Sequence, residues 1–233
     1  MAQFINENRC LDCRHCYKKN PSFSLLNQEE LAFLDEHRIE VRFKEGEVVF
    51  KQGTPLTHLV ILNEGFGKIY VEGPNGRDLI LNFAMPFEII GGPGMHVDMR
   101  HHSSLMVLEK SRACFLEMTA FKQVMKGNPE FHEAFIADCS RRFLHVLNHF
   151  VVLTQKNMEG RIAEALLYLK NQVFGQGHIR LISRQDLADL TAMTKESAMR
   201  VLKDFKSEGL IEENANDIVL LDEKALVRIA QLS

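Results

Sequence analysis

The stretch from Ser183 to Phe205 constrains the fold more than any other part of this chain. Its sequence, SRQDLADLTAMTKESAMRVLKDF, predicts two short helices joined by a tight turn at Thr191-Ala192-Met193. Ser183 can cap the first helix, with Asp186 three residues on in a capping-box arrangement, and Thr194 can cap the second. The apolar positions expected to face inward are Leu187, Ala188 and Leu190 in the first helix and Ala198, Val201, Leu202 and Phe205 in the second. Two capped helices of this kind predict a helix-turn-helix, whose second helix enters the major groove of DNA.

Charge near this stretch agrees with a nucleic-acid contact, although the whole chain carries a net charge of −3. Residues 180–206 contain six Lys or Arg against four Asp or Glu. The outward positions of the second helix are Lys195, Glu196, Met199, Arg200, Lys203 and Lys206. Downstream, Gly209-Leu210-Ile211 and the segment EENANDIVLL predict a polar turn and a strand, which would make a winged variant. On the pattern alone, an ordinary helical hairpin with a solvated face is the alternative.

The segment SRQDLADLTAMTKESAMRVLKDFKSEGLI, with MEGRIAEALLYL upstream, resembles the DNA-binding domain of the cyclic-AMP receptor / fumarate-nitrate regulator (CRP/FNR) family. The resemblance covers nearly the whole chain and is nearer to the FNR branch. It implies a homodimeric transcription regulator that binds double-stranded DNA at a TTGA-like inverted repeat and works with RNA polymerase.

The resemblance also assigns residues to the DNA contact. Glu196 and Arg200 match the pair that reads a TGA-type half-site, because Arg can donate to guanine O6 and N7 while Glu accepts from cytosine N4. Lys195 matches the extra basic reader of the CRP branch. Met199 departs from the Ser or Gly of the two branches, so a contact with a thymine methyl is a hypothesis for it. The expected DNA-binding residues are Ser183, Arg184, Thr194, Lys195, Glu196, Met199, Arg200 and Lys203.

The rest of the chain divides into segments of different character, and the expected fold class is α+β. Short alternating strands punctuated by glycines between Ile39 and about Glu117 predict a barrel or jelly roll, which the resemblance implies is a β-roll of the cyclic-nucleotide-binding type. The expected divisions are an N-terminal arm at 1–21, the β-roll sensor at 22–127, a dimerisation helix at 128–158 and the winged helix-turn-helix at 159–233. No run of 18 apolar residues and no export leader is present, so we expect a cytoplasmic protein without a membrane segment.

A heptad pattern runs through the long helix expected between Glu130 and about Met158, ahead of a hinge at residues 157–160. The seam positions are Ile136, Cys139, Phe143, Val146, Phe150 and Leu153. Such a seam ahead of a domain that needs palindromic half-sites favours a parallel homodimer. The alternative is a helix that packs on its own β-roll.

Cyclic AMP is not the expected effector. The CRP branch holds it with a Gly-Glu-Leu-Gly turn and a later Arg-Ser pair. Here the turn reads Gly91-Gly92-Pro93-Gly94, so Gly92 replaces the glutamate, and His102 stands beside Ser103 where the arginine belongs. A ribose hydroxyl and a phosphate left without partners would cost too much for tight binding.

The cysteines indicate a different kind of sensor, a bound metal cluster. Cys10, Cys13 and Cys16 have the Cys-x-x-Cys-x-x-Cys spacing with which ferredoxins hold three corners of a [4Fe–4S] cluster. The segment HHSSLMVLEKSRACFLEM resembles the FNR segment that supplies the fourth ligand, which implies Cys114. The third cysteine of the FNR branch lies farther on than Cys16. We therefore expect sensing of redox state or a gas through a cluster that aerobic purification can remove.

Other chemistry fits the same cysteines. Zinc could bind Cys10, Cys13 and Cys16 with either His15 or Cys114, because four-coordinate Cys₃His sites are common. A thiol redox pair without metal, or an arm whose cysteines have no role, are the remaining alternatives.

Haem sensing and electron transfer are two further alternatives. His96, His101 and His102 could suggest haem, but an exposed loop explains them, since the FNR segment carries a His pair there too. An iron–sulfur electron carrier lacks the local fourth Cys-Pro and would not need a DNA-binding domain. We expect no enzyme, because the chain has no phosphate-cradling loop, nucleophile elbow or paired His-Glu zinc helix.

Overall fold

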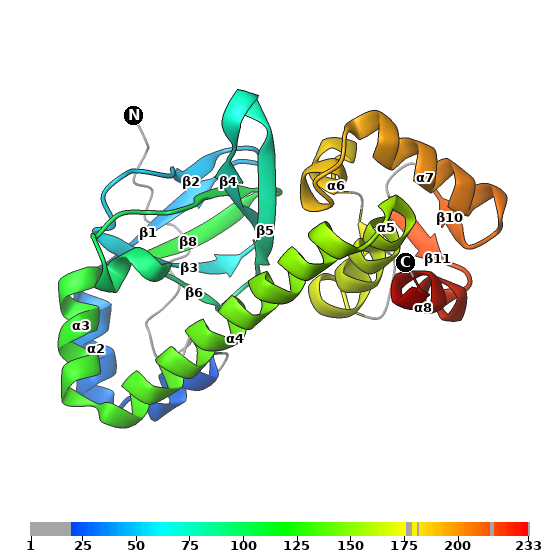
Figure 1. Ribbon diagram of the computed structural model, residues 1–233. Coiled ribbons are helices and arrows are strands. Elements are labelled where there is room, and N and C mark those ends of the chain that lie inside the picture. Colours follow the sequence, from blue (N-terminus) through cyan, green and yellow to red (C-terminus); the bar gives the residue numbers. More distant parts are fainter. Residues whose placement is uncertain (1–19, 176–178, 181, 215–216, 233) are drawn as a thin grey trace. The chain divides into compact units, whose positions relative to one another are not determined.

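The computed structural model describes residues 20–175, 179–180, 182–214 and 217–232. The chain forms two compact units, Met1–Val71 with Asn82–Phe143, and Glu72–Leu81 with Leu144–Ser233. Figure 1 shows the β-strands of the roll and the helices of the C-terminal unit. Among the described residues, no helix is both long and apolar enough to cross a membrane.

The described part of the roll contains two four-stranded sheets, in the orders β1-β8-β3-β6 and β2-β7-β4-β5. Their strands are β1 (Arg38–Phe43), β2 (Val48–Phe50), β3 (His58–Glu64), β4 (Gly67–Glu72), β5 (Asp78–Ala84), β6 (Ile89–Ile90), β7 (Ser104–Val107) and β8 (Ser111–Glu117). In the first sheet β8 pairs antiparallel with β1 and β3, and β3 pairs antiparallel with β6. In the second sheet β7 pairs antiparallel with β2 and β4. The jelly-roll-like strand pattern expected from the sequence is therefore confirmed, with the short β6 as an addition.

Strand β3 is buried on both of its faces, which explains its nearly continuous apolar sequence. One side of it packs in a core that contains Val60, Leu62, Ile90, Leu105, Val107 and Ala113. The other side packs in a core under the helices that contains Leu59, Ile61, Cys114, Leu116, Phe121, Phe131 and Phe135. Leaving any of these side chains in water would forfeit about 1.5–3 kcal/mol for each large aliphatic or aromatic group.

Helices cover the second of these cores. They are the 3₁₀ turn η1 (Pro21–Leu25), α2 (Gln28–Glu36), α3 (Met118–Gly127) and the first half of α4 (Pro129–Gln155). Helices α2 and α3 pack against each other (Figure 1). Asn27 caps α2: its side chain accepts from the backbone N–H of Glu30 at 2.9 Å, and the Glu30 carboxylate accepts from the backbone N–H of Asn27 at 2.8 Å. Arg142 of α4 donates to the carbonyl of Ile89 at 2.8 Å and so ties α4 to β6.

The end of α4 differs from the sequence expectation of a helix to about Met158 and a hinge at residues 157–160. Helix α4 ends at Gln155, and a new helix, α5 (Met158–Tyr168), begins almost at once. The side chain of Asn157 accepts from the backbone N–H of Gly160 at 2.9 Å. Asn157 is thus an N-cap, and Met158 and Gly160 form the first turn of a helix instead of a linker.

The C-terminal unit continues from α5 as a winged helix-turn-helix, as expected. Its further elements are the π-helical turn η4 (Leu169–Val173), β9 (Ile179–Arg180), α6 (Arg184–Leu190), α7 (Lys195–Ser207), β10 (Ile211–Glu213), β11 (Asp217–Leu220) and α8 (Glu223–Leu232). In the described residues β11 lies between β10 and β9, and α5 packs against α7 and α8. The strand β9 and the helix α8 were not anticipated from the sequence.

Candidate nucleic-acid interface

Local hydrogen bonds set the starts of α6 and α7. The backbone N–H of Asp186 donates to Oγ of Ser183 at 3.0 Å, and the N–H of Ser183 donates back to the Asp186 carboxylate at 3.1 Å. The side chain of Thr194 accepts from the N–H of Ser197 at 3.2 Å. The capping box and the second cap expected from the sequence are therefore confirmed, and each satisfies backbone donors that a helix start leaves unpaired.

The turn between the two helices is held by its own backbone. Met193 donates its N–H to the carbonyl of Ala188 at 2.9 Å, and the buried Thr191 hydroxyl donates to the carbonyl of Leu187 at 2.8 Å. Ala192 has a φ of 51°, in the left-handed region that non-glycine residues rarely occupy. This geometry turns the chain sharply enough for α7 to pack across α6.

Helix α7 has one buried and one exposed face. Its buried side chains are Ala198, Val201, Leu202 and Phe205, as the apolar spacing predicted. Lys195, Glu196, Arg200 and Lys203 are exposed on the other side. Because the apolar face anchors α7 to its unit, these polar side chains are presented to the outside at fixed positions along one helix.

The side chain of Arg200 makes only a weak contact that a stronger hydrogen-bond acceptor could replace. Its guanidinium lies 3.9 Å from the sulfur of Met158, at the start of α5. A thioether is a weak acceptor, so this contact offers little resistance to a better acceptor such as a guanine edge.

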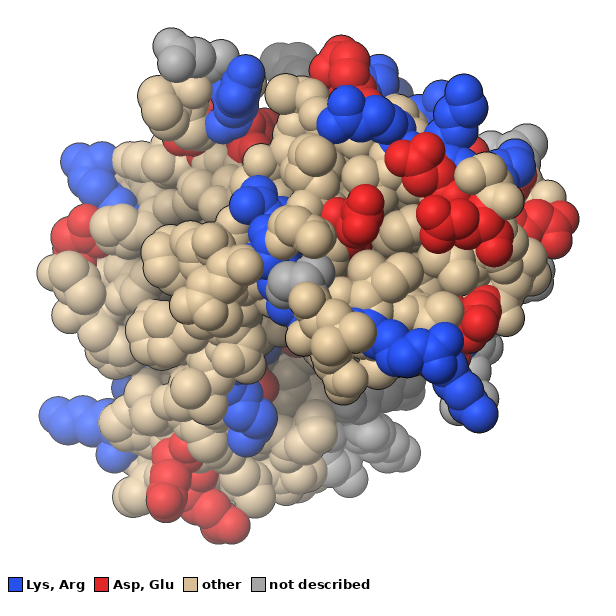
Figure 2. Space-filling model, turned by 45° about the vertical axis from the view of Figure 1, so that its right-hand side comes forward, with Lys and Arg blue, Asp and Glu red and all other residues tan. Residues whose placement is uncertain are grey.

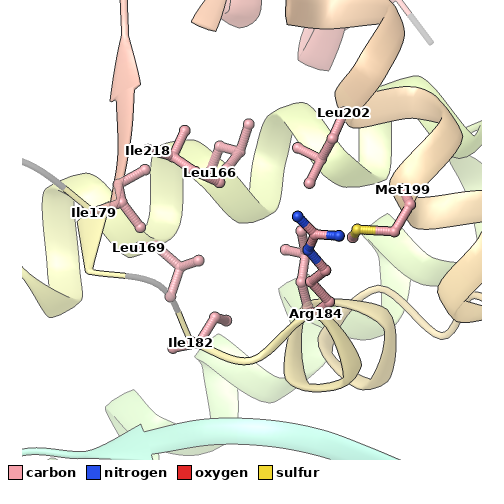
Figure 3. A pocket seen from close by; sticks show the side chains of 9 residues that line it. Leu166, Leu169, Ile179, Ile182, Arg184, Met199, Leu202 and Ile218 are labelled. Atoms are coloured by element: carbon pink, nitrogen blue, oxygen red, sulfur yellow. The ribbon is translucent and has the colours of Figure 1, made fainter. Parts of the chain in front are cut away.

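Arg184 and Met199 meet at an apolar cleft inside the C-terminal unit. Arg184 pairs with Glu213 of β10 at 3.2 Å, and in Figure 3 its guanidinium lies beside the sulfur of Met199. The other side chains that line the cleft are Leu166, Leu169, Ile179, Ile182, Leu187, Leu202 and Ile218. Met199 is only partly exposed, which differs from its expected place among the outward polar residues. It lies one turn before Leu202, so helical spacing brings both toward the same side.

The charge on the surface is mixed. Figure 2 shows one face of the molecule on which Lys and Arg side chains alternate with Asp and Glu side chains, without a single broad basic field. This agrees with the net charge of −3. A DNA interface needs no broad basic field, because phosphate contacts can come from a few basic side chains and from helix N-termini.

The loop that corresponds to a nucleotide-binding turn uses its polar groups within the protein. Gly92 adopts a φ of 73° and offers no side chain. The guanidinium of Arg100 donates to the carbonyl of Gly53 at 2.7 Å, and the ring of His102 lies 3.1 Å from the carboxylate of Asp98. Asp98 also accepts from the backbone N–H of Arg100 at 3.1 Å. Arg100 and His102 are thus already engaged, one by a carbonyl of the turn after β2 and the other by the loop's own carboxylate.

His101 is buried, which corrects the expectation that the histidine pair lies in an exposed loop. Its ring stacks on Phe50 with centroids 3.9 Å apart, and its backbone N–H donates to the carbonyl of Thr54 at 3.0 Å. Burial lowers the pKa of His101 to about 4. His102 remains exposed.

The cysteines fall in different parts of the chain. Cys10, Cys13 and Cys16 lie outside the described residues. Cys114 is 4% exposed on β8, opposite Glu40 of β1 and Ile61 of β3, on the side that faces the helices. The described residues include no group of three His, Cys, Asp or Glu arranged for a metal ion. Of the four cysteines expected to hold a cluster, Cys114 alone lies among the described residues, so the cluster stays a prediction.

The long helix α4 exposes an apolar stripe. Its members, called here the outer stripe, are Ile136, Cys139, Phe143, Leu144, Leu147, Phe150 and Val151. Phe143 is 62% exposed and Phe150 is 64% exposed. Val146 and Leu153 of the expected seam are partly buried in the chain itself, whereas Leu144, Leu147 and Val151 are exposed in addition. The stripe is thus wider than the heptad pattern and shifted toward Leu147, since α4 also covers its own chain.

The combination of an antiparallel β-roll, a long helix and a winged helix-turn-helix defines a class of DNA-binding regulators with a sensor-type domain. Residues 40–128 match the cyclic nucleotide-binding domain family, and residues 160–229 match the Crp-like helix-turn-helix domain family. Together these matches cover more than half of the chain. The chain belongs to the CRP/FNR family of DNA-binding transcription regulators.

Individual relatives are distant but nearly full-length. The chain is 28% identical over 212 residues to electron transport regulator A of Shewanella oneidensis, covering 88% of this chain and 84% of that protein. It is 23% identical over 233 residues to the transcriptional activator protein FnrA of Stutzerimonas stutzeri, covering 97% and 95%. Its fold is similar to the structure of FixK2 from Bradyrhizobium japonicum, with a TM-score of 0.75, 19% identity and coverage of 82% and 96%.

Proposed function

We propose that this chain acts as a homodimer that binds a TTGA-like inverted repeat through α7 and regulates transcription together with RNA polymerase. The observation that carries the proposal is the two-sided α7, in which a buried apolar face holds Glu196 and Arg200 outward. An Arg can donate two hydrogen bonds to guanine, and a Glu can accept from cytosine, so the pair suits a TGA-type half-site.

The outer stripe of α4 supports the dimer. Two copies of the stripe, paired about a twofold axis, would bury the rings of Phe143 and Phe150 that a single chain leaves in water. A buried aromatic side chain removes roughly 150–250 Å² from solvent, so the pairing is worth several kcal/mol. The same twofold axis would present two copies of α7 to the two halves of an inverted repeat.

The proposed signal is redox state or a gas, read by a [4Fe–4S] cluster on Cys10, Cys13, Cys16 and Cys114. Support comes from the ferredoxin-like spacing of the first three and from the place of Cys114 on β8, beneath the helices that begin at residue 21. The cluster would supply a group that oxygen or nitric oxide can alter. Electron transport regulation in the named Shewanella relative agrees with such a signal.

Cyclic AMP fits the loop poorly. His102, which stands where the phosphate-binding arginine is expected, already lies 3.1 Å from the Asp98 carboxylate. Gly92 leaves the ribose hydroxyls without an acceptor.

DNA binding can be tested by fluorescence anisotropy on anaerobically prepared protein. The duplexes carry a TTGA-like inverted repeat, the same repeat with one half scrambled, or both halves scrambled. We expect tight binding to the intact repeat, which weakens steeply between about 50 and 200 mM salt as counterions return to the phosphates. Equal affinity for all three duplexes would contradict sequence-specific binding.

A further inference from the structure

The second half of α4 carries another stripe on a different side from the outer stripe. It consists of His145, His149, Val152 and Lys156, spaced four, three and four residues apart, and all four are partly buried. Both this inner stripe and the helix-turn-helix belong to the C-terminal unit. Helix α4 therefore has one apolar face available to a partner and another face turned into the DNA-binding domain.

The inner stripe contacts several helices of that domain. The ring of His145 lies 4.9 Å from the ring of Tyr168, at the end of α5. The Nζ of Lys156 lies 2.9 Å from the Glu164 carboxylate on α5 and also donates to the carbonyl of Ala230 on α8.

His149 contacts the end of α6, next to the turn that leads into α7. Its Nε2 lies 2.8 Å from the carbonyl oxygen of Leu190, the last residue of α6. The last carbonyls of a helix have no partner within the helix, so His149 satisfies a group that would otherwise need one. A carbonyl only accepts, and Nε2 must therefore carry the hydrogen in this contact. The turn that leads into α7 begins at the next residue.

We propose that His149 is a positioning residue that fixes the turn of the helix-turn-helix to the dimerisation helix. The proposal rests on the proposed function, since it concerns how two copies of α7 are held for two half-sites. If α4 pairs through its outer stripe, a fixed joint at Leu190 sets the distance and angle between the two copies of α7. Because this contact is already formed in the free protein, DNA binding loses less conformational entropy in positioning α7. His149 therefore sets the preferred spacing between half-sites, without touching DNA.

The test compares wild type, His149→Ala and His149→Gln on three kinds of duplex. One carries the repeat at its best spacing, others carry spacers changed by one or two base pairs, and one carries a single half-site. Losing one hydrogen bond in each protomer should weaken binding to the best repeat about fivefold to thirtyfold and flatten the preference for spacing. Affinity for the single half-site should stay within about twofold of wild type, because α7 itself is unchanged.

Glutamine is the conservative variant, since its side-chain amide can donate to the Leu190 carbonyl from a similar reach. His149→Gln should restore most of the affinity and spacing preference that His149→Ala loses. Asn148→Ala, at the exposed neighbouring position, is the matched control and should behave as wild type. Circular dichroism melting and sedimentation of each variant report whether folding and dimerisation are intact.

The outcomes separate the two proposals. Wild-type protein that does not prefer the inverted repeat overturns the proposed function itself. If the wild type does prefer the inverted repeat, but His149→Ala binds the repeat equally or more tightly at every spacing, the positioning role is overturned. Equal losses on the half-site and the full repeat, or no recovery with glutamine, would also overturn it, because they indicate damage to the helix-turn-helix or a role other than hydrogen-bond donation.

Discussion

At the scale of single residues, Arg200 is the side chain whose replacement should change base reading. Arg200→Ala should weaken binding to the preferred repeat by about 1–3 kcal/mol and relax discrimination at one base pair of each half-site, because the guanidinium donors to guanine are lost. Anisotropy titrations against duplexes substituted at each position of the half-site measure both effects.

Arg228→Ala is the matched control for Arg200→Ala. Arg228 is exposed on α8, outside the recognition helix, so its removal takes away the same charge without a base contact. Weakening by Arg200→Ala that is uniform over all sequences would indicate a phosphate contact and contradict the proposed base reading.

Protonation of His101 should lower the stability of the β-roll as the pH falls. Its pKa in the folded chain is about 4, below the ordinary 6.5, so the unfolded chain takes up the proton first as pH falls. The contribution of the neutral, stacked ring to stability is complete above about pH 6.5 and is lost as the pH falls toward about 4. Urea midpoints measured across this range should fall more steeply for wild type than for His101→Gln. Identical slopes for the two proteins would contradict a titrating role for His101.

At the scale of elements, the outer stripe of α4 should govern association. Phe143→Ser combined with Phe150→Ser should convert the dimer to a monomer, because the apolar area that drives pairing is removed. Both rings are exposed within one chain, so the helical circular dichroism of the monomer should change little. Light scattering after gel filtration measures the mass. Asn148→Ser, at an exposed position beside the stripe, is the control, and an unchanged dimer in the double variant would exclude this stripe as the interface.

At the scale of the whole molecule, the proposed cluster joins the N-terminal arm to the roll through Cys114. Anaerobically purified protein should contain about four iron and four sulfide per chain, with absorption that bleaches in air. Cys114→Ala should lose this iron while keeping the fold, since alanine fits the space of the buried thiol. Metal and acid-labile sulfide assays measure the content.

Cys139→Ala serves as the control for cysteine replacement, because Cys139 is exposed on α4, away from the buried core of Cys114. It should retain the iron. Iron that survives Cys114→Ala would exclude Cys114 as the fourth ligand, and one zinc per chain in wild type would replace the redox proposal with a structural metal site.

Local chemistry made much of the architecture predictable. The caps at Ser183 and Thr194 depend on side chains that bond backbone groups three residues away, so the sequence alone located these helix starts. The same holds for the buried face of α7 and for the alternating strands, whose periods are visible in the chain. The structural role of Asn157 was harder to predict from the sequence, because an asparagine can either belong to a hinge or cap a second helix.

Tertiary structure decided the features that depend on distant neighbours. Whether Met199 points to DNA or into the cleft depends on Arg184 and Leu166, and whether His101 is exposed depends on Phe50. The shift of the outer stripe from the expected seam, and the bond between His149 and the Leu190 carbonyl, likewise come from packing between separate elements. The sequence by itself determined the family, through its resemblance to CRP/FNR sequences, and the two capped helices of the helix-turn-helix, through local periodicity and capping. Only the fold decided which side chains on those elements are accessible and which are held, because burial is set by contacts between segments far apart in the chain.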